Sequence, residues 1–404
     1  MTMGLNAVPL PELHPAPAGS LQISIDCRYV RKQASGIGAY VKALVDRLPL
    51  LRPAARFHLW VDPSAPRPLS AEDNVRETEV RPPANGLSTL FVPSRLVDLE
   101  DADVLHEPFN ILGRGIPCPT VVTIHDLMWL ESPAHAEGLS LATPFKAAFY
   151  ADGIRRALRD ATRLVAISRA TADVIRRVDP VAARKVRVIP HGIEVRFRPP
   201  RDRSAARAVS LERLGIRGRY LLVVGQNTPS KNHRAVLEAF AAARLPESVH
   251  LVMLQRLYRG RRLGVLNATP LDQRARELGI ASRVVFPEHL SDDAVVELLQ
   301  GAEALIQFSR YEGFGMPALE ALACGTPVIA SDIAPLVEVL GGAALHVPLR
   351  TGRLALALAL ERLLRDAALA HELSARGPER ARDFSWERSA ALHFDVYREA
   401  ATEG

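Results

Sequence analysis

Short apolar runs alternate with longer stretches of helical periodicity along most of the chain. The runs have the length of strands buried on both faces, and the stretches between them repeat apolar residues every three or four positions. This alternation predicts parallel β-sheets with α-helices on both faces. The predicted strands cover residues 21–25, 56–61, 104–106, 121–124, 164–167, 186–189, 220–224, 249–254, 284–286, 304–307 and 328–330, and the predicted helices include 38–48, 155–159, 170–178, 234–243, 271–278, 292–300, 318–323 and 354–365.

The alternation of predicted strands and helices is interrupted once, over residues 196–208. These residues are rich in arginine and contain adjacent prolines, as linkers often do. We therefore predict an α/β protein of two Rossmann-like, doubly wound domains, residues 21–198 and 199–383, after a flexible N-terminal tail of residues 1–20. Ligands of such sheets bind beyond the carboxyl ends of the strands. With two such domains facing each other, the cleft between them is the expected site.

Composition narrows the class of protein. The 404 residues are 48% hydrophobic and 24% charged, which is ordinary for a globular chain and excludes a fibrous or disordered one. No long apolar run or signal peptide is recognisable, and three scattered cysteines predict neither a disulfide framework nor a zinc site, so a reducing cytoplasm fits. The net charge of +6, mostly arginine, suits phosphate-bearing ligands, an anionic membrane surface or nucleic acid without choosing among them.

The most informative segment reads E-G-F-G-M-P-A-L-E, from Glu312 to Glu320. Gly313 and Gly315 permit a tight turn, and Pro317 suits the first turn of a helix, so Glu312 is expected on a loop at a helix start and Glu320 about one turn inside. Free N–H groups of a helix start bind phosphate, and carboxylates accept hydrogen bonds from sugar hydroxyls. The segment therefore fits a ligand that carries both phosphate and sugar hydroxyls. Alternatively, it is only a glycine loop whose carboxylates are stabilised by the helix dipole.

Two further loops could contact phosphate. A predicted strand ends at Gly225, and a turn then leads to Lys231, which could hold a phosphate as a point charge or be a solvated lysine at a helix start. Gly36 and Gly38 could admit a diphosphate, but a dinucleotide fingerprint needs a third glycine where this chain has Val41. Hydride transfer is therefore not favoured.

His125 follows the predicted buried strand 121–124 and is expected to face the cleft. There it could hydrogen-bond a sugar or help with a proton, or it could be a structural histidine. Asp101 and Asp103 form a D-x-D that could bind a divalent metal. They precede a strand, however, which places them at the wrong edge of the sheet, and we interpret them as solvated. We find no P-loop, nucleophile elbow or zinc-spaced cluster.

Together and in this order, the segments resemble the retaining glycosyltransferases of family four, which have the GT-B fold, over nearly the whole chain from residue 21. Asp26-x-Arg28, followed by the glycines before Tyr40, is similar to the family's opening. Glu312 to Glu320 resembles the family's E-x7-E motif. Further similar segments are residues 106–108, 123–127, 166–168, 189–193, 321–331, Glu338 and 384–386, the last resembling the start of a C-terminal helix, 384–404, that crosses back to the first domain.

The resemblance implies transfer of a hexose from a nucleotide diphosphate sugar to a hydroxyl of a saccharide or lipid-linked acceptor, with retention and without metal or cofactor. It favours GDP-mannose as donor and leaves UDP-hexose and dTDP-rhamnose open. By the same resemblance, Lys231 would neutralise the diphosphate, and Glu320 would bind the ribose. Glu312 would hold the donor sugar together with the backbone of Gly313, Phe314, Gly315 and Met316. Gly36, Gly38 and Gly225 would lie by the donor, His125 would line the sugar and acceptor site, and the base would lie near residues 286–290.

The chain departs from the family pattern at several positions. Ser230 and Asn227 stand where the family often has a basic residue, so one phosphate contact is missing or supplied elsewhere. Ala39 stands where arginine is common, and Pro287 follows Phe286 where glycine is usual. Nearby candidates for the missing contact are Arg256, Arg259, Arg261 and Arg262.

Three other functions stay open. One is another GT-B activity, such as sugar-nucleotide epimerisation or phosphorolysis. Another is a non-catalytic sugar-nucleotide or carbohydrate-binding protein, and the third is a metal-dependent transferase that uses Asp101 and Asp103.

The resemblance also suggests lipid-linked acceptors for surface polysaccharide or lipopolysaccharide and a cytoplasmic protein, including one at the inner face of the membrane. Contact with an anionic leaflet would be made through basic helical positions, which could equally be an ordinary solvated face. These positions are Lys146, Arg155, Arg156, Arg159 and Arg163. Nucleic-acid binding is not expected, because no dense basic–aromatic patch occurs.

Overall fold

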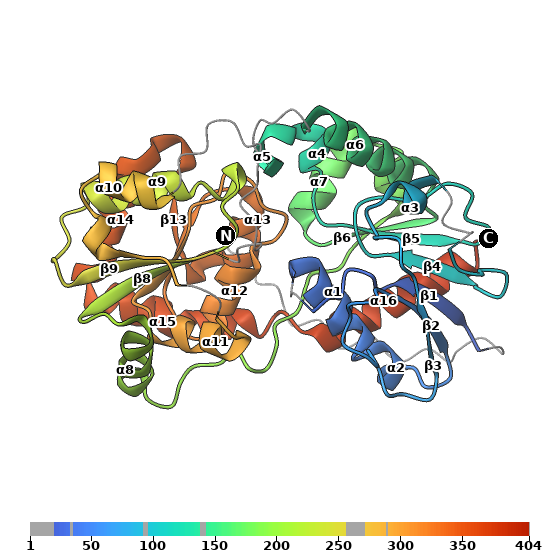
Figure 1. The fold of residues 1–404 in the computed structure, drawn as a ribbon, viewed down its shortest axis with the longest axis horizontal. Helices are drawn as coiled ribbons and strands as arrows, with labels where there is room; N and C mark the ends of the chain where they lie inside the picture. Colours follow the sequence, from blue (N-terminus) through green and yellow to red (C-terminus); the bar gives the residue numbers. More distant parts are fainter. Residues whose placement is uncertain are drawn as a thin grey trace. The chain divides into compact units, whose positions relative to one another are not determined.

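The computed structural model describes residues 20–32, 35–91, 96–137, 143–255, 271–287 and 290–403. The chain forms two compact units, each built on one parallel sheet with helices on its faces (Figure 1). The prediction of two doubly wound α/β domains is therefore confirmed. The first unit comprises Met1–Leu130, Ala148–Gly192 and Asp383–Gly404, and the second comprises Glu131–Ala147 and Ile193–Arg382.

The unit boundaries differ from the predicted ones. The chain enters the second unit after Gly192, not after residue 198. Glu131–Ala147, predicted in the first domain, group with the second unit. Residues from Asp383 onward, after a nearly continuous second unit, belong again to the first.

The sheet of the first unit has seven parallel strands in the order β3-β2-β1-β4-β5-β6-β7. The order reverses between β1 and β4, which pair through Ile25 and His106. Only β3 was missed by the prediction, because V-R-E-T-E is a charged, half-buried edge strand with little apolar signal. The strands are β1 (Gln22–Asp26), β2 (Arg56–Val61), β3 (Val75–Glu79), β4 (Val104–Glu107), β5 (Thr120–Ile124), β6 (Arg163–Ala166) and β7 (Val186–Val188).

Helices cover this sheet. They are α1 (Gly36–Val45), α2 (Leu48–Leu51), α3 (Leu87–Phe91), α4 (Met128–Glu131), α6 (Thr143–Asp160, which begins in the second unit), α7 (Arg169–Val178) and α16 (Trp386–Ala401). Helix α1 starts two residues before its predicted start, because Ser35 caps it: its Oγ accepts from the backbone N of Gly38 at 2.9 Å. A Cβ on Gly38 would lie 2.5 Å from the carbonyl oxygen of Tyr29, so only glycine fits there.

Helix α16 contacts α1 and strands β4 and β5 in the first unit (Figure 1). Ser385 caps its start, and Trp386, Phe394 and Tyr397 are buried. A Cβ on Gly192 would lie 2.1 Å from the backbone N of Trp386. The last residue before the chain leaves the first unit thus lies against the segment on which the chain returns.

The sheet of the second unit has six parallel strands in the order β10-β9-β8-β11-β12-β13. The order reverses between β8 and β11. The prediction missed only the short β13, which has a single fully buried residue. The strands are β8 (Arg219–Val224), β9 (Val249–Leu254), β10 (Val284–Val285), β11 (Ala304–Gln307), β12 (Val328–Ser331) and β13 (Leu345–Val347).

The prediction of a linker over residues 196–208 is wrong for its second part, which is helical. Asp202 caps α8, its Oδ1 accepting from the backbone N of Ser204 at 2.8 Å and of Ala205 at 3.1 Å. Helices α13 and α15 were not predicted. The helices of the second unit include α5 (Pro133–Glu137), α8 (Arg203–Leu214), α9 (His233–Ala242), α10 (Leu271–Glu277), α11 (Asp292–Gly301), α12 (Met316–Ala323), α13 (Ala334–Leu340), α14 (Gly352–Arg365) and α15 (Ala367–Ala381).

Candidate functional site

Two loops of the second unit start where the strand order reverses. The chain leaves β8 at Gly225 and β11 at Gln307, and these strands are neighbours. Gly225 has φ +151°, and Lys231 closes a 3₁₀ turn, Pro229–Lys231, before Asn232 adopts a left-handed conformation. Crevices at such reversals are the usual ligand sites of open parallel sheets. The topology thus brings Lys231 and Glu312, which lie 81 residues apart, to one place.

Lys231 and Glu312 form a bidentate ion pair. Lys231 Nζ donates to Glu312 Oε1 at 2.7 Å and to Oε2 at 2.8 Å, with the side chains 23% and 9% exposed. Glu312 Oε1 also accepts from Gln307 Nε2 at 2.8 Å and Ser309 Oγ at 2.6 Å. An ammonium has three N–H donors, so one remains beside this carboxylate. Gln307 and Ser309 hold Glu312 independently of Lys231.

The start of α12 is tied to the same carboxylate. Gln307 Oε1 accepts from the backbone N of Ala318 at 3.0 Å, while its Nε2 donates to Glu312. Gly315 has φ +99°, and a Cβ there would lie 2.4 Å from Leu336 Cδ2, so the turn before Met316 requires glycine. Gln307 therefore couples the position of Glu312 to the first turn of the helix. Sequence reasoning missed this residue, although its place at the end of a buried strand marks it.

The remaining members of the predicted E-x7-E loop lie as expected. Glu312 and Gly313 precede α12, Phe314 is buried, and Glu320 lies inside the helix, half-buried. Burial, reinforced by the negative charge of Glu320, raises the pKa of the Cys324 thiol to about 12. Cys324 is therefore an inert thiol at neutral pH.

The turn that carries Lys231 is anchored to the Glu312 loop. Asn232 Nδ2 donates to the carbonyl of Phe308 at 3.2 Å, and the backbone N of Arg310 donates to the carbonyl of Ser230 at 2.7 Å. Ser230 is buried, with Oγ 2.9 Å from Thr228 Oγ1, so a basic side chain in its place would lose this contact. The exposed Asn227 has no such constraint.

His233, at the start of α9, is buried beside this ion pair. Burial, together with the positive charge of Lys231, lowers the pKa of His233 to about 4. The imidazole is therefore neutral at neutral pH and leaves the charge balance of Lys231 and Glu312 unchanged. No role was predicted for His233 from the sequence.

His125 lies at the end of β5 in the first unit. Its backbone N donates to Asn110 Oδ1 at 2.7 Å, and its ring Nε2 lies 2.8 Å from the carbonyl oxygen of Pro108. A carbonyl only accepts, so Nε2 carries the hydrogen and Nδ1 is the acceptor. Burial lowers the pKa of His125 to about 4. The neutral ring can accept a hydrogen bond from a hydroxyl but cannot serve as an imidazolium acid at neutral pH.

The Asp26-x-Arg28 motif at the end of β1 is a buried ion pair. Arg28 Nε donates to Asp26 Oδ1 at 2.8 Å and Nη2 to Oδ2 at 2.5 Å, while Nη1 donates to Thr89 Oγ1 at 2.9 Å. Burial and the nearby Asp26 charge raise the pKa of Glu107 well above its usual range. The Asp26–Arg28 pair thus ties the carboxyl end of β1 to Thr89.

Gly36, predicted to lie in a loop, lies with Gly38 in the first turn of α1. Gly38 is fixed by its approach to Tyr29, whereas a Cβ on Gly36 would meet no heavy atom within 4 Å. Both glycines and His125 belong to the first unit, and Gly225, Lys231, the loop 312–316 and Glu320 belong to the second.

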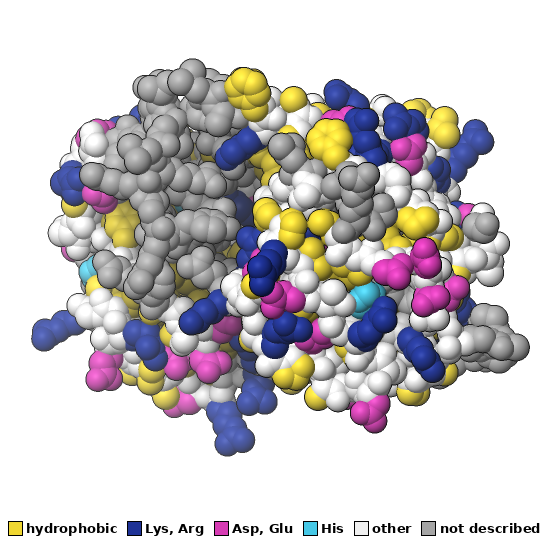
Figure 2. Space-filling view, turned by 45° about the vertical axis from the view of Figure 1, so that its right-hand side comes forward, with side chains coloured by type: hydrophobic (Ala, Val, Ile, Leu, Met, Phe, Trp, Pro, Cys, Tyr) yellow, Lys and Arg dark blue, Asp and Glu magenta, His cyan; other side chains and the backbone are white. Residues whose placement is uncertain are grey.

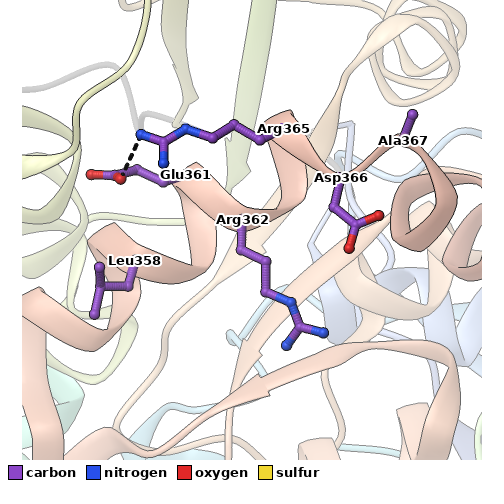
Figure 3. A pocket seen from close by; sticks show the side chains of 6 residues that line it. All are labelled: Leu358, Glu361, Arg362, Arg365, Asp366 and Ala367. Carbon is purple, nitrogen blue, oxygen red and sulfur yellow. Dashed lines mark hydrogen bonds and ion pairs between the residues drawn. The ribbon is translucent and has the colours of Figure 1, made fainter.

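A surface hollow of about 630 Å³ lies on α14 and the start of α15 (Figure 3). Leu358, Glu361, Arg362, Arg365, Asp366 and Ala367 line it, and Arg365 pairs with Glu361 at 2.8 Å. None of these residues is a predicted site residue. The hollow therefore does not mark the candidate site.

Asp103 accepts through Oδ2 from the backbone N of Gln22 at 2.7 Å, which places it at the amino end of β4. The D-x-D thus lies at the edge opposite His125, as predicted. Within the described ranges no group of three His, Cys, Asp or Glu is arranged to hold a metal ion. Residues 288–289 of the proposed base region, and the arginines between 256 and 262, lie outside the described residues.

The predicted basic face of α6 and its surroundings is not continuous. Arg156 is buried and donates to the carbonyl of Leu112 at 2.9 Å and to Asp152. Arg163 pairs with Glu399 at 3.2 Å. On the face in Figure 2, basic side chains are interspersed with acidic ones. In the part of the chain that the structure describes, no helix has the length and apolar character to cross a membrane.

Comparison with known proteins assigns both halves of the chain. The model of Glycosyltransferase Family 4 matches residues 34–197, and that of Glycosyl transferases group 1 matches residues 212–380. The chain is 32% identical to a D-inositol 3-phosphate glycosyltransferase of Rhodococcus jostii over 70% of this chain and 61% of that protein. It is 29% identical to an MMP alpha-(1->4)-mannosyltransferase of Mycolicibacterium hassiacum over 74% of this chain and 71% of that protein.

The fold is similar to that of sucrose-phosphate synthase from Thermosynechococcus elongatus, with a TM-score of 0.72 and 20% identity over 95% of this chain and 100% of that one. This likeness concerns the fold alone. The chain spans about three fifths of the Rhodococcus relative, at 61%. Since the two family models match successive domains in order, the chain belongs to the group 1 glycosyltransferases of family four, with the GT-B fold.

Proposed function

We propose that the protein is a retaining glycosyltransferase that moves a hexose from a nucleotide diphosphate sugar to an acceptor hydroxyl without a metal ion. The ion pair between Lys231 and Glu312, at the reversal of strand order and beside the start of α12, carries the proposal. It places a cation, a carboxylate and helix N–H groups where such sheets bind ligands.

Lys231 and Glu312 bind different parts of the donor. The free N–H of Lys231 binds the diphosphate, and the ammonium shifts toward it as negative charge develops on the leaving group. Gln307 and Ser309 keep Glu312 in place during that shift. The carboxylate oxygens then accept hydrogen bonds from donor-sugar hydroxyls, and the backbone of Gly313, Phe314, Gly315 and Met316 holds the same sugar. Gly225 lies by the donor, and Glu320 binds the ribose.

The transfer step is a front-face substitution. The bond between the anomeric carbon and the phosphate oxygen breaks, a bond to the acceptor oxygen forms on the same face, and a phosphate oxygen takes the acceptor proton. The sugar passes through an oxocarbenium-like state. His125, neutral and with Nδ1 as acceptor, orients a sugar or acceptor hydroxyl. Gly36 and Gly38, at the start of α1, approach the diphosphate.

GDP-mannose is the first donor we propose, since one relative is named a mannosyltransferase. The other relative is named for inositol 3-phosphate, which supports a hydroxyl of a phosphorylated polyol or saccharide as acceptor. A lipid-linked acceptor, reached by a cytoplasmic protein at the inner face of the membrane, is supported by Phe145, which is 80% exposed beside the exposed Lys146 on α6.

A nucleotide panel tests donor binding. We expect one of GDP, UDP, dTDP and ADP, first of all GDP, to raise the melting temperature by a few degrees, because a ligand at one hundred times its dissociation constant adds about 2.7 kcal/mol. The shift should be the same with EDTA and smaller in the Lys231→Ala protein. A shift that requires a divalent ion would contradict the metal-free site, and no shift with any nucleotide would favour a carbohydrate-only binder.

Product stereochemistry tests the reaction. With GDP-mannose and a mannoside acceptor in EDTA, the anomeric proton of the product should show the donor's configuration by NMR. An inverted product would rule out front-face transfer. Donor consumption without acceptor would indicate an epimerase, dependence on free phosphate a phosphorylase, and binding without turnover across many acceptors a non-catalytic protein.

A further inference from the structure

A buried network of histidine, tyrosine and threonine side chains joins α16 to α1 and the sheet of the first unit. Tyr40 Oη lies 2.8 Å from Thr123 Oγ1 and 2.7 Å from His393 Nε2. His106 Nε2 lies 2.9 Å from Thr123 Oγ1, and Tyr397 Oη lies 2.8 Å from His106 Nδ1. All five side chains are buried, and Tyr40 and His393 are 353 residues apart in sequence.

The backbone fixes the direction of these hydrogen bonds. His393 Nδ1 lies 2.7 Å from the carbonyl oxygen of Ser389, so Nδ1 carries the hydrogen. Burial lowers the pKa of His393 to about 4, so Nε2 is an unprotonated acceptor. Tyr40 must then donate to His393 Nε2 and accept from the hydroxyl of Thr123.

The same logic continues along the network. The Thr123 hydroxyl is used as a donor to Tyr40, so its oxygen accepts from His106 Nε2–H, and His106 Nδ1 accepts from the Tyr397 hydroxyl. Burial keeps the pKa of His106 well below its usual range, so its ring too is neutral. Every donor in the network thus has one acceptor, and each hydrogen bond has one direction.

Tyr40 contacts His125 directly. The two rings meet edge to face, with centroids 5.0 Å apart and planes at 86°. The ring centroid of Tyr40 also lies 4.9 Å from that of His191, where the chain leaves the first unit, and 6.1 Å from that of Trp386, where the chain returns. The other end of the network, Tyr397, contacts His106 and His393 instead.

We propose that Tyr40 is a positioning residue for His125, and that His393 on α16 fixes Tyr40 for this task. The hydroxyl of Tyr40 is held from both sides, so its ring has one orientation against the imidazole. That orientation keeps Nε2–H of His125 on the carbonyl of Pro108 and Nδ1 available as an acceptor. The consequence for turnover rests on the proposed function, whereas the effect on the ring does not.

Two matched substitutions test the proposal. Tyr40→Phe removes a buried hydroxyl bonded to Thr123 and His393, and Tyr397→Phe removes one bonded to His106 alone, so both should lower the melting temperature, Tyr40→Phe by more. Only Tyr40→Phe should lower kcat, by about fivefold or more, with the KM for the donor changed less than about twofold. In proteins with ¹⁵N-labelled histidine, only Tyr40→Phe should move the imidazole signals of His125, which are assigned by their loss in His125→Asn.

A second pair of variants covers the case in which Tyr40→Phe does not fold. His393→Ala removes the acceptor of Tyr40, and His393→Gln supplies an amide oxygen instead. We expect His393→Gln to recover most of the His125 signal position and turnover that His393→Ala loses.

Equal effects of Tyr40→Phe and Tyr397→Phe on kcat and on the His125 signals would overturn the proposal and leave a structural network. A moved His125 signal with unchanged kcat would overturn the catalytic consequence. Absence of turnover in the unmodified protein would instead reject the proposed function, and the NMR signals would still decide whether Tyr40 positions His125.

Discussion

Lys231→Ala is expected to lower turnover at least about tenfold, which corresponds to ~1.4 kcal/mol of activation free energy. The substitution removes the only side-chain cation that the described residues place on Glu312. The leaving diphosphate then loses a preorganised positive charge, which acts mainly in the transition state. Turnover under saturating donor, measured by release of the nucleoside diphosphate, is the direct measurement.

Glu312→Ala should cause a loss of similar size, because Lys231, Gln307 and Ser309 would lose their shared acceptor. Lys42→Ala is the matched control, since it breaks another lysine–carboxylate pair, with Asp46, on the exposed surface of α1. Its turnover should stay near normal. Near-normal turnover of a folded Lys231→Ala or Glu312→Ala protein would contradict the role given to that residue.

The free energy of unfolding is expected to fall strongly between pH 7 and pH 5. Burial lowers the pKa of His125 and His393 to about 4 and keeps the pKa of His106 and His191 well below the usual range. A histidine with a depressed folded pKa contributes its full stability above ~6.5, its unfolded pKa, and loses it as pH falls toward 4, because only the unfolded chain takes up the proton. One such group costs about 2 kcal/mol at pH 5.

Urea unfolding followed by circular dichroism at pH 7, 6 and 5 measures this dependence. The buried Glu107 acts in the opposite direction, because its raised pKa favours the folded state as pH falls. A single carboxyl is outnumbered by the histidines of the first unit. Equal unfolding free energies at pH 7 and pH 5 would show that these imidazoles are solvated in the folded protein.

Most of the fold follows from local pattern. The central strands are continuous apolar runs because parallel strands are covered on both faces, and these were predicted to within one or two residues. The edge strand β3 was not predicted, because its exposure to solvent permits charged residues there and leaves little apolar pattern. Helix α8 was not predicted, because its capping residue, Asp202, directly follows a proline-rich segment, and the whole stretch was interpreted as a linker. Local pattern also placed Gly36 in a loop, although a single capping hydroxyl, Ser35, starts the helix there.

The sequence predicted which residues belong to the candidate site, but not the contacts between them. The glycines and the proline after Glu312 predicted a loop before a helix, and the structure has that loop. That Glu312 binds Lys231, and that Gln307 and Ser309 hold it, depends on two strands meeting at the reversal of their order. The contact of Tyr40 with His393 spans 353 residues and has no local signal at all.

The return of the chain to the first unit at Asp383 has a consequence for synthesis. A ribosome adds about 5–20 residues per second, so on the order of ten to forty seconds pass between Gly192 and Asp383. During that time the first sheet exists without α16, and the faces of Tyr40 and His106 that α16 buries stay uncovered. The second unit can finish folding before the first. The nascent chain therefore exposes an unfinished core throughout that interval, which is the state that chaperones bind.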